Sequence, residues 1–174
     1  MAPGRGVTNR DTGVVVRECF ACAQRSVLVA GYAVYQGREV FRALADRMVE
    51  RPDLSARMFL DVQRGPGDTS MPSEVVKRFA QRFKTREWPE GRPLPKVFYD
   101  PRSLDLDSDK RACLHAKCVV VDDEGVFISS ANFTEAAQQR NIEMGLLVKS
   151  PWLAGEVTRH FDTMLGARLF ERVL

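Results

Sequence analysis

The residue types best suited to chemistry gather in one part of the chain, between positions 114 and 143. This stretch contains a histidine, a lysine, a serine, an asparagine and a glutamate: His115, Lys117, Ser130, Asn132 and Glu143. Lysine supplies positive charge, serine and asparagine supply directional hydrogen-bond donors, and an imidazole can act as nucleophile or acid. Together they predict a phosphate-binding site with a reactive histidine.

A predicted hairpin brings the two halves of this set together. Residues 115–121 and 126–129 are apolar runs of the kind found in strands, and His115 and Lys117 would project from one strand face, about 6–7 Å apart. The acidic residues 122–124 and the following glycine are typical of a tight turn. The second strand would therefore return Ser130 and Asn132 to the end of the sheet that carries His115.

This arrangement resembles the signature of the phospholipase D superfamily, which is HxK, four residues, D, six residues, then GSxN. The first part is matched by His115, Lys117 and Asp122, the second by Ser130 and Asn132, and a downstream NxE element by Asn141 and Glu143. Serine at position 129 stands where the family usually has glycine, and glycine tolerates backbone dihedrals that serine avoids.

The resemblance implies a role for each residue of the motif. His115 would attack phosphorus to form a covalent phosphohistidine, which water or an alcohol then resolves, while Lys117, Ser130 and Asn132 hold the non-bridging oxygens. Glu143 would accept a hydrogen bond from the far ring nitrogen of His115 and fix its tautomer.

Asp122 is a candidate catalytic residue because it completes the first part of the motif. It lies seven residues from His115, on the other strand parity and at the turn, so a structural role is favoured over a phosphate contact. No metal and no cofactor belongs to the predicted site, because lysine and amide donors already offset the phosphate charge. The CxxC pair Cys19 and Cys22 is interpreted as small buried cysteines rather than half of a zinc site, since structural zinc needs four ligands.

The single motif implies an assembly of two chains. Members of the family use one histidine as nucleophile and another to protonate the leaving group, and this chain has one such histidine. The implied solution is a homodimer with both copies of His115 in a shared active site. The other histidine, His160, has no motif around it and is interpreted as a packing or surface residue.

The segments around the motif predict an α/β fold. Helical spacing of apolar residues and short β-branched runs alternate before three strands follow one another. Predicted helices cover 11–24, 38–51, 72–85 and 151–172, and predicted strands cover 26–32, 56–62, 96–100, 115–121, 126–129 and 142–148. This order indicates a phospholipase-D-like α-β-α sandwich with a mixed β-sheet. Residues 1–10 are predicted to be a flexible tail, and 11–174 a single phospholipase-D-like domain.

Positive charge is concentrated between positions 77 and 102, although the net charge of the chain is only +3. Four of these residues are candidate substrate contacts along a phosphate backbone: Lys84, Arg86, Arg92 and Lys96. The alternative is a solvated helix face and loop. The longest apolar stretch is too short to span a bilayer, and no apolar run of the secretory kind follows the N-terminus. We therefore expect a cytoplasmic protein with no membrane partner.

Three functions are compatible with this sequence. The favoured one is a metal-independent phosphodiesterase, a nuclease that acts on DNA rather than RNA. The second is a phospholipase, disfavoured because no amphipathic membrane-binding stretch stands out. The third is a catalytically silent DNA-binding or assembly subunit.

A looser resemblance favours the nucleic-acid alternatives. Residues 31–40, together with 114–117 and 141–145, resemble the phospholipase-D-like component of bacterial anti-phage defence systems of the DISARM class. This resemblance implies helicase and methyltransferase partners that act on foreign DNA.

Overall fold

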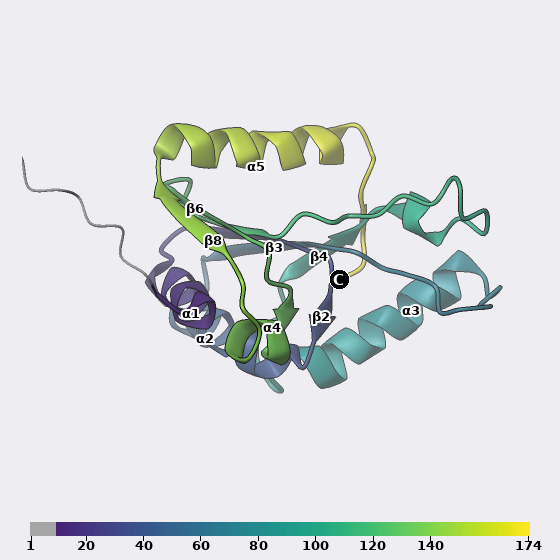
Figure 1. The fold of residues 1–174 in the computed structure, drawn as a ribbon, viewed down its shortest axis with the longest axis horizontal. Coiled ribbons are helices and arrows are strands. Elements are labelled where there is room, and N and C mark those ends of the chain that lie inside the picture. The colour runs from purple at the N-terminus through teal and green to yellow at the C-terminus, as the bar shows by residue number, and fades with distance from the viewer. Residues whose placement is uncertain (1–9) are drawn as a thin grey trace, which may run out of the picture.

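The computed structural model describes residues 10–174, apart from the side chains of residues 138 and 139. Its centre is a seven-stranded sheet of order β8-β6-β5-β1-β3-β4-β9. Helix α5 (Pro151–Gly166) covers one face of the sheet, and α1 (Thr12–Cys22), α2 (Gly37–Glu50) and α3 (Pro72–Arg82) cover the other (Figure 1). The α/β class and the mixed sheet are confirmed. The predicted tail at residues 1–10 falls almost wholly outside the described residues.

The sheet has three parallel strands at its centre and antiparallel strands on both sides of them. The parallel strands are β1 (Ser26–Gly31), β3 (Ser55–Leu60) and β4 (Lys96–Tyr99). The antiparallel strands are β5 (Cys118–Val121), β6 (Gly125–Ser129), β8 (Gly145–Lys149) and β9 (Glu171–Arg172). A separate two-stranded parallel pair joins β2 (Val34–Tyr35) to β7 (Phe133–Thr134).

Both faces of the sheet are packed with apolar side chains. The larger core lies under α1, α2 and α3, where Phe41 is fully buried against Phe20 and Trp88. The smaller core lies under α5, where the ring of Phe59 is 4.6 Å from that of Phe161. Burial on both faces explains why these strands read as continuous apolar runs in the sequence.

Several predicted elements end at different places in the structure. The strand predicted over 115–121 begins only at Cys118, because β1, its partner, reaches its last pair at Ala30. The helix predicted to run to residue 172 ends at Gly166, and the chain then turns through Arg168, which has a φ of 58°. It returns as β9 along β4.

Short elements were not predicted because they carry no periodic pattern. They are β2, β7, β9, α4 (Glu135–Gln139) and the 3-10 turn η2 (Pro101–Leu104), whereas the helix predicted over 72–85 continues beyond α3 as the π-helical turn η1 (Phe83–Glu87). Helices α1, α4 and α5 begin at side-chain caps, since Asp11 accepts from the amide of Gly13, Thr134 from that of Ala137 and Ser150 from that of Leu153. Among residues 10–174, none of the helices combines the length and apolar character needed to cross a bilayer.

The order and direction of the strands bring the candidate site residues together at one end of the sheet. The carboxyl ends of β1 and β3 lead into Tyr32 and Asp61. Strand β5 runs antiparallel to β1, with Cys118 opposite Ala30, so its amino end lies at the same place. His115 and Lys117 precede that amino end and therefore lie close to Tyr32 and Asp61.

Candidate active site

His115 and Lys117 form the centre of the candidate site. They lie just before β5, outside any strand, and the Lys117 Nζ is 3.3 Å from the His115 Nδ1 and donates a 3.1 Å hydrogen bond to the His115 carbonyl. The two groups are thus closer than the strand geometry predicted. The imidazole is exposed, so a phosphate can reach both groups at once.

Tyr32 supports this pair from the end of β1. Its ring centroid is 4.6 Å from that of His115, with the ring planes inclined by 52°. The Lys117 Nζ lies 5.6 Å from the centre of the same ring, within the range of a cation–π contact. The sequence analysis missed Tyr32. Its position immediately after a buried parallel strand was the available signal, because ligands in α/β sheets bind outside such carboxyl ends.

Ser130 and Glu143 meet at the end of β6. The Ser130 Oγ donates a 2.5 Å hydrogen bond to the Glu143 Oε2 and accepts one of 3.0 Å from the amide of Met144. Asn141 donates to the other carboxylate oxygen of Glu143 at 3.4 Å. The bond predicted between Glu143 and His115 is not formed among the described residues. Pairing of β6 with β8 draws Glu143 to Ser130 instead, as the 2.9 Å bond from the Ser130 amide to the Met144 carbonyl shows.

Serine replaces the family's glycine at position 129 without strain. Ser129 is not among the described residues with positive φ, so its backbone does not require glycine. Its hydroxyl accepts a 2.9 Å bond from the Ala131 amide and donates one of 3.2 Å to the Met144 carbonyl. The side chain therefore stabilises the turn that presents Ser130 and Asn132.

Asn132 enters the site through the β2–β7 pair. It is half-buried and directly precedes β7, whose Phe133 amide donates a 3.1 Å bond to the carbonyl of Ala33. Ala33 is the neighbour of Tyr32 in the chain. The pair therefore holds the Asn132 segment beside the segment that contacts His115.

Asp122 lies at the opposite end of β5 from His115 and forms no part of the cluster. Its carboxylate accepts three backbone hydrogen bonds at the start of β1, from the amides of Gln24, Arg25 and Ser26 at 2.6–2.8 Å. Burial raises its pKa, but these three donors outweigh burial, so the pKa lies below its ordinary value. This geometry agrees with the structural role favoured from the sequence, and it removes Asp122 from the candidate catalytic residues.

The predicted basic contacts are distributed over the surface. Lys84 and Arg86 are exposed on η1, whereas Arg92 pairs with Asp46 at 2.9 Å and Lys96 begins β4, away from the carboxyl ends of the strands. None of the four lines the cavity next to Tyr32. Two arginines of the same segment do line it: Arg78 and Arg82.

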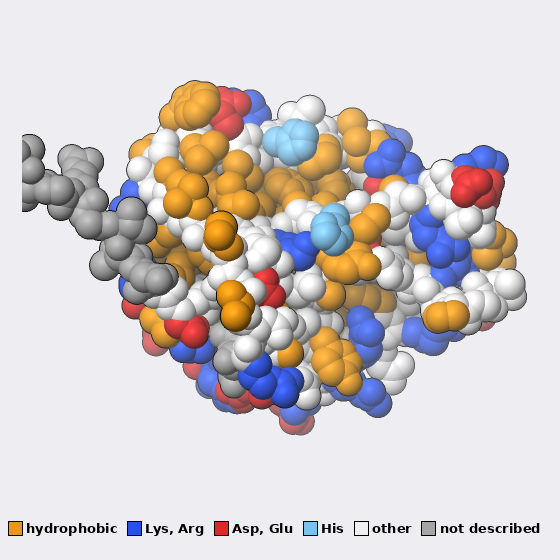
Figure 2. Space-filling view, viewed as in Figure 1, with side chains coloured by type: hydrophobic (Ala, Val, Ile, Leu, Met, Phe, Trp, Pro, Cys, Tyr) orange, Lys and Arg blue, Asp and Glu red, His pale blue; other side chains and the backbone are white. Residues whose placement is uncertain are grey.

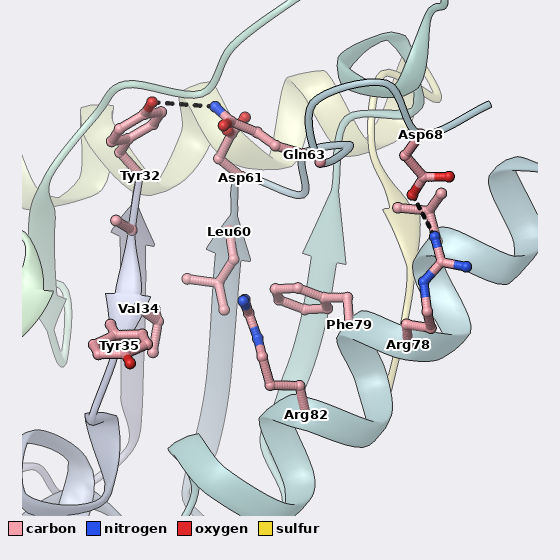
Figure 3. A pocket seen from close by; sticks show the side chains of 13 residues that line it. Tyr32, Val34, Tyr35, Leu60, Asp61, Gln63, Asp68, Arg78, Phe79 and Arg82 are labelled. Atoms are coloured by element: carbon pink, nitrogen blue, oxygen red, sulfur yellow. Dashed lines mark hydrogen bonds and ion pairs between the residues drawn. The ribbon is translucent and has the colours of Figure 1, made fainter. Parts of the chain in front are cut away.

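That cavity has a volume of about 540 Å³ and lies between α3 and the carboxyl ends of β1 and β3. Figure 3 shows Asp61 and Gln63 at its upper end, close to Tyr32, and Arg82 reaching inward from α3. The Asp61 Oδ1 accepts a 3.0 Å hydrogen bond from the amide of Leu114, the residue before His115. Asp61 was also missed by the sequence analysis, because this contact spans 53 positions of the chain.

Apolar side chains are exposed beside the cluster. They lie on β6, on β8 and in the segment before β8: Ile128, Ile142, Met144 and Leu146. Figure 2 shows hydrophobic side chains gathered over β6 and β8, with histidine and basic side chains visible on the same face. His160 is exposed on α5 and packs edge-on against Phe161 at 6.0 Å, in agreement with its interpretation as a surface residue.

Most of the chain is similar to one protein family and to one curated relative. Residues 16–165 match the family model described as "Cardiolipin synthase, PLD-like domain". The chain is 31% identical, over 139 residues, to the DISARM protein DrmC of Bacillus paralicheniformis, which covers 80% of this chain and 50% of that protein. The chain thus spans about half the length of this curated relative.

Solved structures share the fold at low sequence identity. Nuc from Salmonella typhimurium, a phospholipase D family member, is 18% identical with a TM-score of 0.60, covering 91% of this chain and 88% of its own. NucT from Helicobacter pylori is 16% identical with a TM-score of 0.59, covering 88% and 86%. The phosphatidylserine synthase of Haemophilus influenzae is 16% identical with a TM-score of 0.61, covering 96% of this chain but 38% of that one.

Proposed function

The chain belongs to the phospholipase D superfamily, and on that premise we propose that it is a phosphodiesterase that cleaves nucleic acid, DNA rather than RNA, at His115. The observation that carries the proposal is the 3.3 Å approach of the Lys117 ammonium to the His115 imidazole within the matched motif. An exposed imidazole beside a fixed cation suits attack on an anionic phosphodiester.

The proposed reaction proceeds in two displacements. Lys117 lies at Nδ1, so Nε2 is the nitrogen left to attack phosphorus. A nitrogen–phosphorus bond forms, the bond to the leaving oxygen breaks, and that oxygen takes a proton from a second imidazole. Water then gives its proton to that second imidazole and displaces His115. Ser130 and Asn132 would donate to the non-bridging oxygens while charge develops, so we propose that no metal ion is required.

We propose that the second imidazole comes from a second copy of the chain. The described residues contain one histidine in the motif cluster, and His160 lies on α5 without phosphate-binding neighbours. The exposed apolar side chains of β6 and β8 adjoin Ser130 and Glu143, and β8 is an edge of the large sheet. A two-fold contact across this edge would cover them and bring two copies of His115 together.

The biological setting we propose is anti-phage defence. The similarity to a protein named as DISARM protein DrmC supports this assignment, with helicase and methyltransferase partners as implied by the sequence resemblance. The nuclease would then act in the cytoplasm, where such partners meet foreign DNA. The chain spans about half the length of that relative, so the helicase and methyltransferase partners of the whole protein are proposed for this chain and not inferred from the match alone.

A second candidate function is a DNA-binding subunit that does not cleave. It is favoured by one observation: Glu143 bonds to Ser130 and Asn141, and the bond that would orient His115 is not formed among the described residues. A site without this orientation still binds phosphate through Lys117. The exposed apolar side chains beside the cluster are assigned to the proposed dimer contact and not to a membrane surface, so a phospholipase is not proposed.

A cleavage assay separates these functions. Labelled single-stranded DNA, double-stranded DNA and RNA are incubated with wild type or with His115→Ala, each with magnesium and with excess EDTA. We expect cleavage by wild type in both conditions and none by the variant, and a denatured wild-type reaction should retain acid-labile label on histidine. Binding without cleavage supports the silent subunit. Cleavage that survives His115→Ala, or that EDTA abolishes, contradicts the mechanism.

A further inference from the structure

The cavity beside Tyr32 contains a buried acceptor that the reaction at His115 does not use. Asp61 is only 8% exposed, and its Oδ2 is buried without a hydrogen-bond donor among the described residues. The nearby Gln63 amide donates a 3.2 Å hydrogen bond to the Tyr32 hydroxyl, and it lies close enough to Asp61 to lower the pKa of the carboxyl without reaching hydrogen-bond geometry at Oδ2. An unsatisfied buried carboxylate oxygen is destabilising, so its presence indicates a ligand that supplies the missing donor.

The neighbours of Asp61 affect both the pKa and the orientation of its carboxyl group. Burial is the main effect and raises the pKa of Asp61, while the Leu114 amide, Gln63 and His115 each lower it in part. The Leu114 amide already bonds to Oδ1 and fixes the orientation of the carboxylate. The free oxygen therefore occupies a defined position next to the reactive histidine.

The walls of the cavity have the chemistry of a nucleotide site. Tyr35 on β2 is 62% exposed, whereas Phe79 on α3 lines the opposite side but is mostly buried. Arg78 is held by Asp68 at 2.5 Å, whereas Arg82 reaches into the cavity, lies over the Phe79 ring at 5.6 Å from its centroid, and is 3.9 Å from its nearest carboxylate, on Glu87 (Figure 3). An exposed tyrosine ring can stack on a base and an arginine can contact phosphate, which is the usual pattern of single-strand binding.

The cavity is also joined to the reactive centre. Tyr32 forms one of its walls and at the same time lies against the imidazole of His115. A nucleotide whose base enters the cavity would therefore leave its sugar–phosphate next to His115 and Lys117. The volume of about 540 Å³ is within the range of small-ligand sites and is sufficient for one nucleotide.

We propose that this cavity, called the base pocket below, binds an unstacked nucleobase next to the scissile phosphate, and that Asp61 selects bases with an exocyclic amino group. The base pocket is defined by Tyr32, Tyr35, Asp61, Gln63, Phe79 and Arg82. The inference rests on the proposed function, since it names the substrate of the same site. Adenine, cytosine and guanine can donate an amino hydrogen to Oδ2. Thymine and uracil have no exocyclic amino group, and their ring N3–H lies between two carbonyl oxygens that a carboxylate repels.

A consequence is that the preferred substrate is single-stranded. A base whose amino group donates to Asp61 cannot keep that group in a Watson–Crick pair, so a duplex must first be opened or the nucleotide extruded. Single strands avoid that step.

The experiment measures binding and cleavage separately. Fluorescence anisotropy with His115→Asn, which should not cleave, gives affinities for equal-length oligo(dA), oligo(dC) and oligo(dT), and competition with the free nucleoside monophosphates tests the base alone. Guanine is tested only as the monophosphate, because long guanine runs fold on themselves. We expect about tenfold weaker binding of thymine than of cytosine or adenine, as one hydrogen bond to a charged acceptor provides.

Two variants test the assignment to the base pocket. Asp61→Asn keeps the shape and can still accept from the Leu114 amide, but its amide can donate to a carbonyl, so the preference should fall to about twofold or less. Tyr35→Ala should weaken binding of every base to a similar extent and leave the preference unchanged. The control is Asp53→Asn, the same change just before the start of β3 instead of after its end, and it should leave affinity and preference unaltered.

The outcomes separate this inference from the proposed function. If wild type fails to cut any oligonucleotide but His115→Asn still binds cytidine and adenosine monophosphates in preference to thymidine monophosphate, the nuclease proposal fails and the base pocket stands. If cleavage occurs but wild type and Asp61→Asn show the same base preference, the base pocket is wrong and the nuclease proposal stands.

Discussion

The ring of Tyr32 lies against the imidazole of His115, with the centroids 4.6 Å apart, so the residue that follows a buried strand positions the histidine proposed as nucleophile. Strand β1 is fully enclosed between β3 and β5, and Tyr32 follows it directly. The orientation of an otherwise exposed histidine is therefore set by the most rigid part of the sheet.

This contact predicts a difference between two substitutions at position 32. Tyr32→Ala removes the ring and lets the imidazole rotate, and misplacement of a nucleophile is expected to lower kcat roughly tenfold to a hundredfold. Tyr32→Phe keeps the ring and should stay within about threefold of wild type. Steady-state cleavage with matched thermal-denaturation curves checks both. Equal losses for the two variants would assign the effect to the hydroxyl and its bond with Gln63.

The Ser130–Glu143 hydrogen bond predicts non-additive kinetics. If Glu143 acts through Ser130, the double variant Ser130→Ala, Glu143→Gln should be no slower than the slower single variant. A double-mutant cycle measured on kcat/KM should then give a coupling energy between Ser130 and Glu143 of about 1–2 kcal/mol. If Glu143 instead serves His115 directly, the two losses multiply. A double variant whose loss of kcat/KM equals the product of the two single losses would therefore contradict the assignment that Glu143 acts through Ser130.

Asp122 is expected to matter for stability and not for the chemical step. Asp122→Ala leaves three backbone amides at the start of β1 without their acceptor and should lower the free energy of unfolding by roughly 3 kcal/mol. Activity per folded molecule should be retained. Urea denaturation and an active-site titration measure the two quantities separately, and a stable but inactive variant would restore Asp122 to the catalytic residues.

The lowered pKa of Asp122 also predicts how this contribution varies with pH. A depressed pKa in the folded state stabilises the fold above the unfolded pKa of about 3.9, and this stabilisation is lost as the pH falls through the folded value. The difference in unfolding free energy between wild type and Asp122→Asn should be constant above about pH 5 and shrink below about pH 4. A difference independent of pH would mean that the charge of Asp122 contributes nothing.

The basic residues predict a graded salt dependence. Arg82→Ala should reduce the slope of log affinity against log salt by roughly 0.7 for single-stranded DNA. Lys84→Ala and Arg86→Ala, exposed on the turn that follows α3, should act in the same direction if the strand continues past Arg82. Arg92, paired with Asp46, and Lys96, at the start of β4, should change the slope less. An unaltered slope for all of them would mean that they are solvated.

If two subunits share one active site, a single inactive subunit should inactivate the whole dimer. Wild type mixed with excess His115→Ala under subunit exchange should lose activity well beyond dilution, because a mixed dimer lacks one imidazole. Leu146→Glu on β8 should give an inactive monomer, whereas Val49→Glu, at another exposed apolar position, on α2, should not. Activity that follows the wild-type fraction alone, or a monomer that still cleaves, contradicts the dimer.

The sequence was most informative where residue type and spacing act together. His115, Lys117, Ser130, Asn132 and Glu143 were predicted to share one end of a sheet because a hairpin with a tight acidic turn connects their segments, and their role in catalysis stays a prediction. Asp122 could be separated from them because strand parity and its position at the turn both favoured structure over chemistry.

Residues that reach the site through long-range contacts could not be identified in the same way. Asp61 bonds to a residue 53 positions later, and Tyr32 meets His115 only because β1 and β5 pair antiparallel. No local pattern encodes either contact. Strand β9 was not predicted for a related reason. Its two residues pair with β4 only because the chain turns at Arg168, which adopts a left-handed conformation. Such a turn is usually marked in a sequence by glycine, and position 168 is an arginine.

The insertion of β5 beside β1 also sets the order in which this protein can be completed during its synthesis. At about 5–20 residues per second, the ribosome needs on the order of ten seconds to proceed from β1 to β5. Until then one edge of β1 has no neighbour, although its other side can already pair with β3 and β4. Nascent chains therefore expose an apolar edge before the histidine exists, and a chaperone that binds extended strands would meet the protein in this interval. The candidate site cannot form until that edge is closed, because His115 and Lys117 lie at the amino end of β5.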